Sequence, residues 1–297
     1  MIWFGVLAIL TLTACGQSEP EFAYDSEKPT NPETPQPPTP TPGSLSTKMI
    51  FGGTPVREGK MLAIVGLTRP RAWTPSCTGI LIQPDMVLSA AHCFCENPTN
   101  GDAYVGHDAS VEGGRYYKIA KVKLLTSCPF EGGTDLDLAV VKLIGPIKRA
   151  SPMPFAALTS VDKAKRFRVA GFGAIDLQAL KFPAQKREAV IPKVSSACQG
   201  SQGDRSDAKA FGCRSGAEIV AGQIGLPDSC AGDSGGPLLV TAAGEPGARS
   251  APDLLLAGVT SRSVVESEHP CGSGGVYVRL TPDARQRVTQ AIAALRN

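Results

Sequence analysis

The stretch Gly232–Leu239, which reads GDSGGPLL, decides the fold expected of this chain. It places Ser234 between a carboxylate and two glycines, and an apolar run follows. Glycines suit a sharp loop whose backbone amides point at a reacting oxygen, so Ser234 is the candidate nucleophile. A glycine-rich turn without any chemistry would have the same sequence, so the interpretation depends on partners elsewhere in the chain.

A base and an orienting carboxylate for Ser234 lie upstream. Of the three histidines, only His92 lies in a tightly specified motif, VLSAAHC. The segment TDLDLAVVKL then places Asp137 directly before an apolar strand, where a buried carboxylate could hold an imidazole in one tautomer. Asp135 in the same segment is the rival carboxylate for this role. Together these residue types predict nucleophilic catalysis with general acid–base assistance.

In chain order, the segments around His92, Asp137 and Ser234 resemble the chymotrypsin and trypsin family of serine proteases. The resemblance extends from Ile50 to the C-terminal helix. It implies that His92 is the general base, Asp137 its orienter and Ser234 the nucleophile. The amides of Gly232 and Ser234 would form the oxyanion hole. The implied activity is an endopeptidase that acts on proteins and peptides through an acyl-enzyme, without a cofactor.

Short apolar runs separated by Gly and Pro breaks recur along the chain, among them MLAIVGL, DLAVVKL and GVYVRL. This pattern predicts an all-β fold, and the resemblance implies two antiparallel six-stranded β-barrels with the active site between them. We expect one protease domain over 50–297, with barrel 1 at about 50–160 and barrel 2 at about 161–280. In PDARQRVTQAIAAL, apolar residues at helical spacing predict a C-terminal α-helix over about 282–296.

The composition narrows the class of protein further. Hydrophobic residues make up 42% of the 297 residues and charged residues 19%, which excludes a coiled coil and a polytopic membrane protein. The net charge of +3 comes from 30 basic and 27 acidic residues spread along the chain, so we expect no binding to nucleic acid. A monomer is the default expectation.

The N-terminal residues up to Met49 are expected to lie outside the protease domain. Residues 1–14 are an apolar stretch too short to span a bilayer comfortably and placed like an export signal. The ending Leu-Thr-Ala-Cys resembles a bacterial lipoprotein signal, so Cys15 would carry a lipid anchor; an ordinary cleaved signal is the alternative. Residues 15–49 contain KPTNPETPQPPTPTPG, which predicts an extended tether, with a proline-rich recognition ligand as the alternative.

Nine cysteines are many for a reducing compartment, and eight could form four disulfides once Cys15 is set aside for lipid. Three pairs are implied by the resemblance and the fourth follows by elimination, in the order Cys77–Cys93, Cys198–Cys213, Cys230–Cys271 and Cys95–Cys128. A metal site in AHCFC is the alternative, but one His and two Cys at this spacing lack the usual ligand pattern. We therefore expect no metal.

The resemblance also assigns the floor of the primary specificity pocket, which lies six residues before the nucleophile and is Asp228 here. A carboxylate there, followed by Ser229, would pair with a guanidinium or ammonium group, so cleavage is expected after Arg or Lys. An Asp that caps a solvated turn is the alternative. Gly275 matches the family's small wall residue.

The opposite wall of this pocket departs from the family. Where the family usually has Ser-Trp-Gly, this chain has Ser261, Arg262 and Ser263. The serine in place of glycine would narrow the entrance, and Arg262 would bring a positive charge to an aromatic subsite. The segment SVVESEHP looks like an insertion beside the pocket, where Glu266 or Glu268 could select basic neighbours in the substrate.

The segment IFGGTPV matches the new N-terminus that forms when a precursor of this family is cleaved. After cleavage of the Met49–Ile50 bond, the ammonium group of Ile50 would pair with Asp233. Because Met49 precedes the cut, an enzyme specific for Arg or Lys should not activate itself, and an activating protease is the expected partner. Cleavage would also free an exported, membrane-anchored precursor into the periplasm or the extracellular space.

The sequence also bears on calcium binding and on two rival functions. The family's calcium loop has only a weak counterpart around His107 and Arg115, so we expect no calcium requirement. A catalytically silent binding protein that keeps the fold for recognition is the main rival function, and the intact triad argues against it. An esterase with the same triad is a weaker rival, which the charged pocket floor disfavours.

Overall fold

The computed structural model describes residues 50–70, 72, 74–95, 101–106, 108–109, 114–128, 136–241, 254–265 and 267–297. Several features predicted from the sequence lie outside these ranges, namely the signal at 1–14, Cys15, the tether at 15–49, His107, Asp135 and Glu266. In the part of the chain that the structure describes, no helix combines the length and apolar composition needed to cross a membrane.

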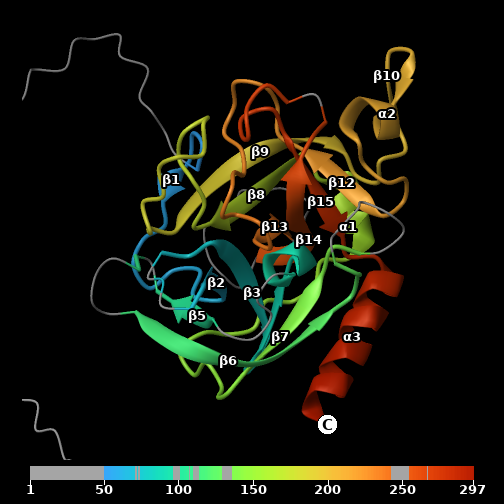
Figure 1. Cartoon of the computed structure of the whole chain (residues 1–297). Coiled ribbons are helices and arrows are strands. Elements are labelled where there is room, and N and C mark those ends of the chain that lie inside the picture. The colour runs from blue at the N-terminus through green and yellow to red at the C-terminus, as the bar shows by residue number, and fades with distance from the viewer. Residues whose placement is uncertain are drawn as a thin grey trace, which may run out of the picture. The chain divides into compact units, whose positions relative to one another are not determined.

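Six antiparallel strands close the first barrel in the order β2-β3-β4-β7-β6-β5 (Figure 1). They are β2 (Ile64–Thr68), β3 (Cys77–Gln83), β4 (Met86–Ser89), β5 (Asp102–Val105), β6 (Arg115–Leu124) and β7 (Ala139–Leu143). β2 and β4 are buried along their whole length, whereas most of the longer β6 is exposed. The apolar runs seen in the sequence thus fill the interior of this barrel, as the hydrophobic effect requires.

The second barrel is also six-stranded, because pairing between β8 and β9 closes the order β9-β12-β15-β14-β13-β8. Its strands are β8 (Arg166–Gly171), β9 (Arg187–Ser195), β12 (Glu218–Ala221), β13 (Pro237–Thr241), β14 (Leu254–Ser263) and β15 (Gly275–Arg279). The short β1 (Thr54–Pro55) adds to β9 outside the ring, and β10 (Ser201–Gln202) pairs with β11 (Arg205–Ser206) as a separate hairpin.

Four helical segments complete the described part of the chain: a 3₁₀ turn η1 (Ala91–Phe94), α1 (Leu158–Lys163), α2 (Asp207–Phe211) and α3 (Pro282–Arg296). α3 packs on β6 and β7 with its apolar stripe, in which Val288, Ile292 and Leu295 are buried (Figure 1). Its first turn is capped by Thr281, whose side chain accepts the amide of Ala284 at 3.2 Å. The predicted all-β fold of two six-stranded barrels with a C-terminal helix is confirmed.

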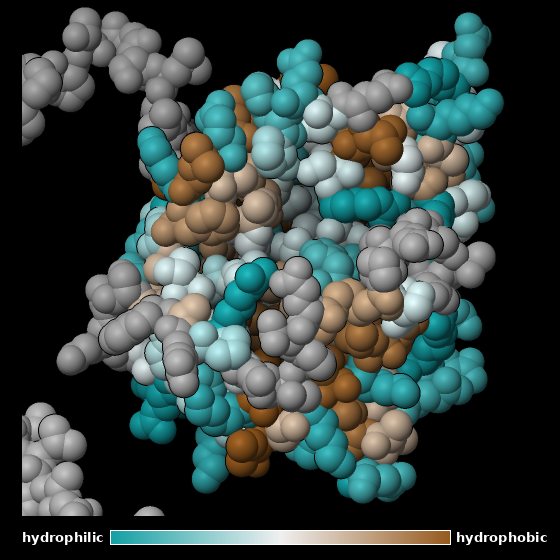
Figure 2. Space-filling model, viewed as in Figure 1, coloured by the Kyte–Doolittle hydropathy of each residue, from teal (hydrophilic) through white to brown (hydrophobic). Residues whose placement is uncertain are grey.

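The surface agrees with a fold whose apolar side chains lie mainly in the interior. On the side shown in Figure 2, hydrophilic residues dominate the described surface, and apolar residues gather in small separate patches. The largest set of buried apolar side chains surrounds Ile80 and Leu88 in the first barrel and continues into β13, β14 and β15 of the second barrel. A second set surrounds Phe167 and Tyr277 inside the second barrel. Because binding and catalytic residues concentrate on loops that a rigid scaffold holds in place, we expect the functional site in the loops where the barrels meet.

Candidate active site

His92 and Asp137 are brought together by two segments of the first barrel. η1 carries His92, and the segment that enters β7 carries Asp137. The ring Nδ1 of His92 lies 2.8 Å from Oδ2 of Asp137, and the backbone amide of His92 donates to Oδ1 at 3.0 Å. Two contacts to one carboxylate fix both the position and the plane of the imidazole.

The Asp137 carboxyl is fully buried and yet held as an anion. A third donor reaches it from the second barrel, because the hydroxyl of Ser261 donates to Oδ2 at 2.6 Å. Burial alone would raise the pKa of Asp137, but the hydrogen bonds and charge of His92 and the bond from Ser261 lower it below its ordinary value. In the neutral form of His92, the contact with Asp137 holds the proton on Nδ1 and leaves Nε2 as a proton acceptor.

Ser234 lies on a tight loop that faces His92 across one pocket, which both residues line. The loop contains two glycines in the left-handed region, Gly232 with φ +93° and Gly235 with φ +81°. A Cβ at Gly232 would also lie 2.9 Å from the Cα of Gly173, so glycine is required there. No hydrogen bond joins Ser234 to His92 in the described structure; such bonds often tighten only when a substrate is bound.

Within the described part of the chain, two backbone amides of this loop, those of Gly232 and Ser234, are free to donate to a substrate oxygen, whereas their neighbours are bonded within the protein. The amide of Asp233 donates to the carbonyl of Cys230 at 2.9 Å and that of Gly235 to Thr260 at 2.8 Å. Among the described residues, by contrast, no acceptor takes the amide of Gly232 or that of Ser234. The two amides predicted to form an oxyanion hole thus donate to none of the described residues and belong to the loop that carries Ser234.

Asp233 is a buried carboxyl whose partners in the described part of the chain are two amides. It accepts from Gly173 at 2.8 Å and from Cys230 at 2.9 Å. Burial raises its pKa to about 7, and the nearby charge of Asp228 adds to this effect. Ile50 is also buried, with 1% of its surface exposed. An ammonium group close to Asp233 would remove the cost of charging it.

Asp228 is buried, with 1% of its surface exposed. Its Oδ1 accepts the amide of Ser229 at 2.8 Å, and its Oδ2 accepts the amides of Gly274 at 2.8 Å and Gly272 at 3.1 Å. Burial raises the pKa of Asp228 to about 6, although these amides act in the opposite direction. The carboxyl is thus a fixed acceptor rather than the cap of a solvated turn.

Ser229 and Gly275 shape the space beside Asp228. The hydroxyls of Ser229 and Tyr277 lie 3.0 Å apart, which fixes the Ser229 side chain. A Cβ at Gly275 would lie 3.0 Å from the Ser229 hydroxyl oxygen and from that of Tyr277, so a larger residue there would press on both. The main-chain amide of Asp228 itself donates to the carbonyl of Phe51 at 2.9 Å, which connects Asp228 to the segment after Ile50.

Arg262, expected to bring a positive charge to this wall, is paired with a carboxylate of its own protein. Its guanidinium contacts both oxygens of Glu218, at 2.9 and 2.8 Å, and donates to the carbonyl of Gly212 at 2.8 Å. Glu218 is fully buried and also accepts from the backbone and side chain of Arg214. The charge of Arg262 is therefore largely offset by its own protein partner.

The other two residues of this wall take different positions. The hydroxyl of Ser261 donates to Asp137, a contact that the sequence did not predict, since it placed Ser261 only on the pocket wall. The match to the family's Ser-Trp-Gly segment was the signal that could have drawn attention to it. Ser263 is exposed, and its hydroxyl donates to the carbonyl of Pro270 at 2.7 Å, across the inserted segment that also contains Glu268.

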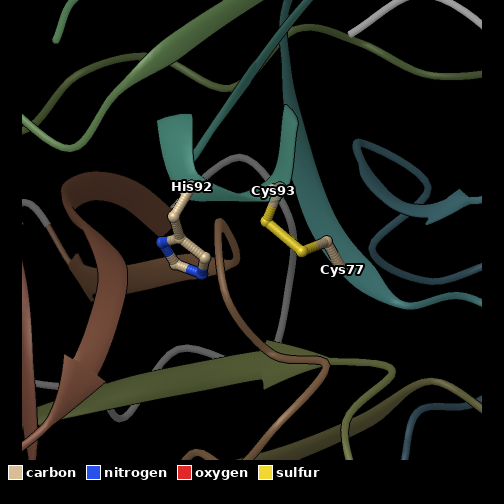
Figure 3. Close-up of side chains that lie close together, drawn as sticks. All are labelled: Cys77, His92 and Cys93. Carbon is tan, nitrogen blue, oxygen red and sulfur yellow. A yellow bond between two sulfur atoms is a disulfide. The ribbon is translucent and has the colours of Figure 1, made fainter. Parts of the chain in front are cut away.

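The eight cysteines of the domain form four disulfides, Cys77–Cys93, Cys95–Cys128, Cys198–Cys213 and Cys230–Cys271, the pairs named from the sequence. Figure 3 shows the His92 ring beside the first of them, with Cys93 on η1 and Cys77 on β3. The two sulfurs nearest His92 are bonded to each other, so neither is a thiolate that could bind a metal ion. Arg115, at the position expected for a calcium ligand, is exposed at the start of β6.

Comparison with known proteins agrees with this geometry. The Trypsin family model matches residues 50–286. The chain is 32% identical over 193 residues to a trypsin-like protease of Streptomyces glaucescens, covering 64% of this chain and 66% of that protein. It is 31% identical over 239 residues to mouse serine protease 56, which covers 78% of this chain but only 37% of the relative.

The chain thus spans less than two thirds of the length of these relatives. Among solved structures, mouse neuropsin, described as a serine protease expressed in the limbic system of the brain, superposes with a TM-score of 0.58 at 19% identity. The match covers 82% of this chain and 99% of neuropsin, and it shows the fold. With the family model matched over most of its length, the chain belongs to the trypsin family of serine proteases.

Proposed function

We propose that this protein is a serine endopeptidase in which His92, Asp137 and Ser234 act together. Nε2 of His92 takes the hydroxyl proton of Ser234 as the serine oxygen attacks the scissile carbonyl carbon. The amides of Gly232 and Ser234 stabilise the oxyanion that forms. His92 then gives its proton to the leaving amine, and a water molecule hydrolyses the acyl-enzyme by the same steps in reverse. The 2.8 Å contact between His92 and Asp137 is the observation that carries this proposal.

We propose that cleavage follows Arg or Lys. Asp228 supports this, because backbone amides hold its carboxyl in place, with the amide of Ser229 on Oδ1 and those of Gly272 and Gly274 on Oδ2. An arginine or lysine side chain of the substrate would donate to the remaining lone pairs. Its positive charge would also lower the pKa of Asp228 from about 6 and keep the carboxyl charged. One relative of the chain, 32% identical over 176 residues, is the trypsin of Simulium vittatum.

We propose further that the protein is made as a zymogen and cut between Met49 and Ile50. The buried Asp233, with its raised pKa, supports this, since it is the carboxyl that a new ammonium group on Ile50 would stabilise. We also propose that residues 1–14 are an export signal, that Cys15 carries a lipid and that residues 15–49 tether the domain until it is cut. Replacing Cys15 by serine would then move the precursor from the membrane fraction to the soluble fraction.

Hydrolysis of small amide substrates tests the function and the specificity together. The full chain, with the recognition sequence of a site-specific protease inserted directly before Ile50, would be cleaved and assayed on substrates that differ only in Arg, Lys, Phe or Ala before the scissile bond. Fast cleavage after Arg and Lys, absent from Ser234→Ala and from the uncleaved chain, is the expected result.

Two other outcomes have clear meanings. Cleavage confined to Phe or Ala would retain the triad and reject the role proposed for Asp228. Absence of all activity in the cleaved and correctly disulfide-bonded protein would reject the enzyme and favour a binding protein that keeps only the fold.

A further inference from the structure

Thr78 is a buried residue of β3 that makes contact with the loop of Ser234 through its backbone and its side chain. Its amide donates to the carbonyl of Ser234 at 2.8 Å, and its hydroxyl donates to the carbonyl of Gly232 at 2.9 Å. No surface of Thr78 is exposed. A residue of the first barrel therefore contacts both ends of the segment that contains the two oxyanion amides.

The direction of the Thr78 hydroxyl is fixed by a second contact. The amide of Phe172 donates to the same oxygen at 3.2 Å, so the hydroxyl proton is left for the carbonyl of Gly232. The side chain is also tightly enclosed: a Cβ at Gly171 would lie 2.9 Å from its oxygen, and one at Gly236 would lie 3.1 Å from its methyl group. A side chain at either glycine would therefore press on Thr78.

The peptide group that Thr78 holds lies between the two oxyanion donors. It joins Gly232 to Asp233, and its other end is fixed because the amide of Asp233 donates to the carbonyl of Cys230 at 2.9 Å. The donor on one side is the amide of Gly232, and the donor on the other side is the amide of Ser234. With both ends bonded this peptide cannot rotate, and its plane sets the direction of the amides that flank it.

We propose that Thr78 is a positioning residue for the oxyanion hole. Its hydroxyl holds the Gly232 carbonyl and thereby aims the amides of Gly232 and Ser234 at the oxygen that becomes charged. This inference deepens the proposed function, because it requires those two amides to be the oxyanion donors. Thr78 acts through the loop and does not itself touch the substrate.

The test compares Thr78→Val, which keeps the shape and removes the hydroxyl, with Thr78→Ser, which keeps the hydroxyl. Both are made in the full chain with the cleavable sequence before Ile50. We expect kcat of Thr78→Val to fall by about 10- to 100-fold, less than or similar to the loss of an oxyanion donor itself, with KM changed by less than about threefold. Thr78→Ser should restore kcat to within about threefold of the original chain.

A pair of inhibitors separates positioning from general damage to the fold. With a peptide aldehyde, the oxygen of Ser234 bonds to the aldehyde carbon, its proton moves to His92 and the carbonyl oxygen becomes the oxyanion. A peptide of the same sequence with a reduced CH₂–NH bond fills the same subsites without forming an oxyanion. Thr78→Val should lower the affinity for the aldehyde by the same factor as kcat, and should leave the affinity for the reduced peptide within about threefold of the original value.

Thr281→Val is the matched control, because it also removes a threonine hydroxyl that makes a hydrogen bond but lies at the start of α3. It should lower Tm by about 2–4 °C and leave kcat and aldehyde affinity unchanged. Equal kcat in Thr78→Val and the original chain, or equal weakening of both inhibitors, would overturn the proposal. An original chain that is inactive after cleavage would instead reject the proposed function, so the two failures are distinct.

Discussion

Asp233→Asn in the uncleaved chain tests the proposed role of Asp233 in activation through the pH dependence of stability. The pKa of this carboxyl rises from 3.8 to about 7 in the folded protein because it is buried. A folded-state pKa above the unfolded value means that the folded chain binds the proton more tightly than the unfolded chain. The contribution of Asp233 to stability is therefore largest below its unfolded pKa and is lost as pH rises through 7. At 1.36 kcal/mol per pKa unit, the part of this shift that develops between pH 4 and pH 7 amounts to about 3 kcal/mol.

The assay is denaturant unfolding of the uncleaved chain at several pH values from 4 to 7. We expect the free energy of unfolding to fall by about 3 kcal/mol more in the original chain than in Asp233→Asn, whose side chain does not titrate. The substitution can also turn a side-chain NH₂ group toward the amide of Cys230, so the variant is less stable at low pH. The test therefore compares how steeply the free energy of unfolding changes with pH in the two chains, because the altered hydrogen bond to Cys230 also changes the stability itself.

Cleavage before Ile50 should reverse the slope. If the new ammonium group pairs with Asp233, the folded-state pKa of the carboxyl falls below its ordinary value. Its contribution to stability is then present above the unfolded pKa and is lost as pH falls. A cleaved chain that loses stability between pH 4 and pH 7 as the uncleaved chain does would refute the proposed pair.

Three other substitutions test separate parts of the site. Glu218→Gln leaves Arg262 without its buried carboxylate and should lower the free energy of unfolding by about 3 kcal/mol, measured by denaturant unfolding. Its kcat on small substrates should stay within about threefold of the original value. An unchanged free energy of unfolding would show that the pair contributes nothing to stability. Asp228→Ser should lower kcat/KM on Arg and Lys substrates by at least about 100-fold while sparing Ala substrates, and equal losses on both would reject the assigned pocket floor. Ser261→Ala removes a charge-assisted hydrogen bond from Asp137 and should lower kcat/KM by about 10-fold, which steady-state kinetics would detect; full activity would contradict its support of the triad.

The parts of the site that the sequence predicts are those that depend on short motifs. His92 and Ser234 each lie in a stretch whose local geometry is set by neighbouring residues, as the left-handed Gly232 and Gly235 illustrate. The barrels are predictable for a similar reason, because short apolar runs between Gly and Pro breaks specify strands one at a time. The resemblance to a known family then supplied the order of the strands, which local pattern does not contain.

The contacts that the sequence did not predict are long-range hydrogen bonds across the junction of the barrels. Ser261 and Asp137 are separated by 124 residues, and Thr78 and Gly232 by 154. Which hydroxyl reaches which carbonyl depends on the closure of both barrels, and no motif records that. Arg262 shows the same limit, because a charge that looks isolated in sequence meets Glu218 on another strand.

Covalent labelling of Ser234 tests the central claim most directly. A fluorophosphonate would be added to the full chain before and after cleavage ahead of Ile50, and the labelled residue identified by mass spectrometry of peptides. The serine oxygen bonds to phosphorus as fluoride leaves and the proton passes to His92, so only an activated serine reacts. The account predicts a label on Ser234 that appears on cleavage and is lost in His92→Ala. A cleaved, disulfide-bonded chain that stays unlabelled, or labels equally well without His92, would contradict it.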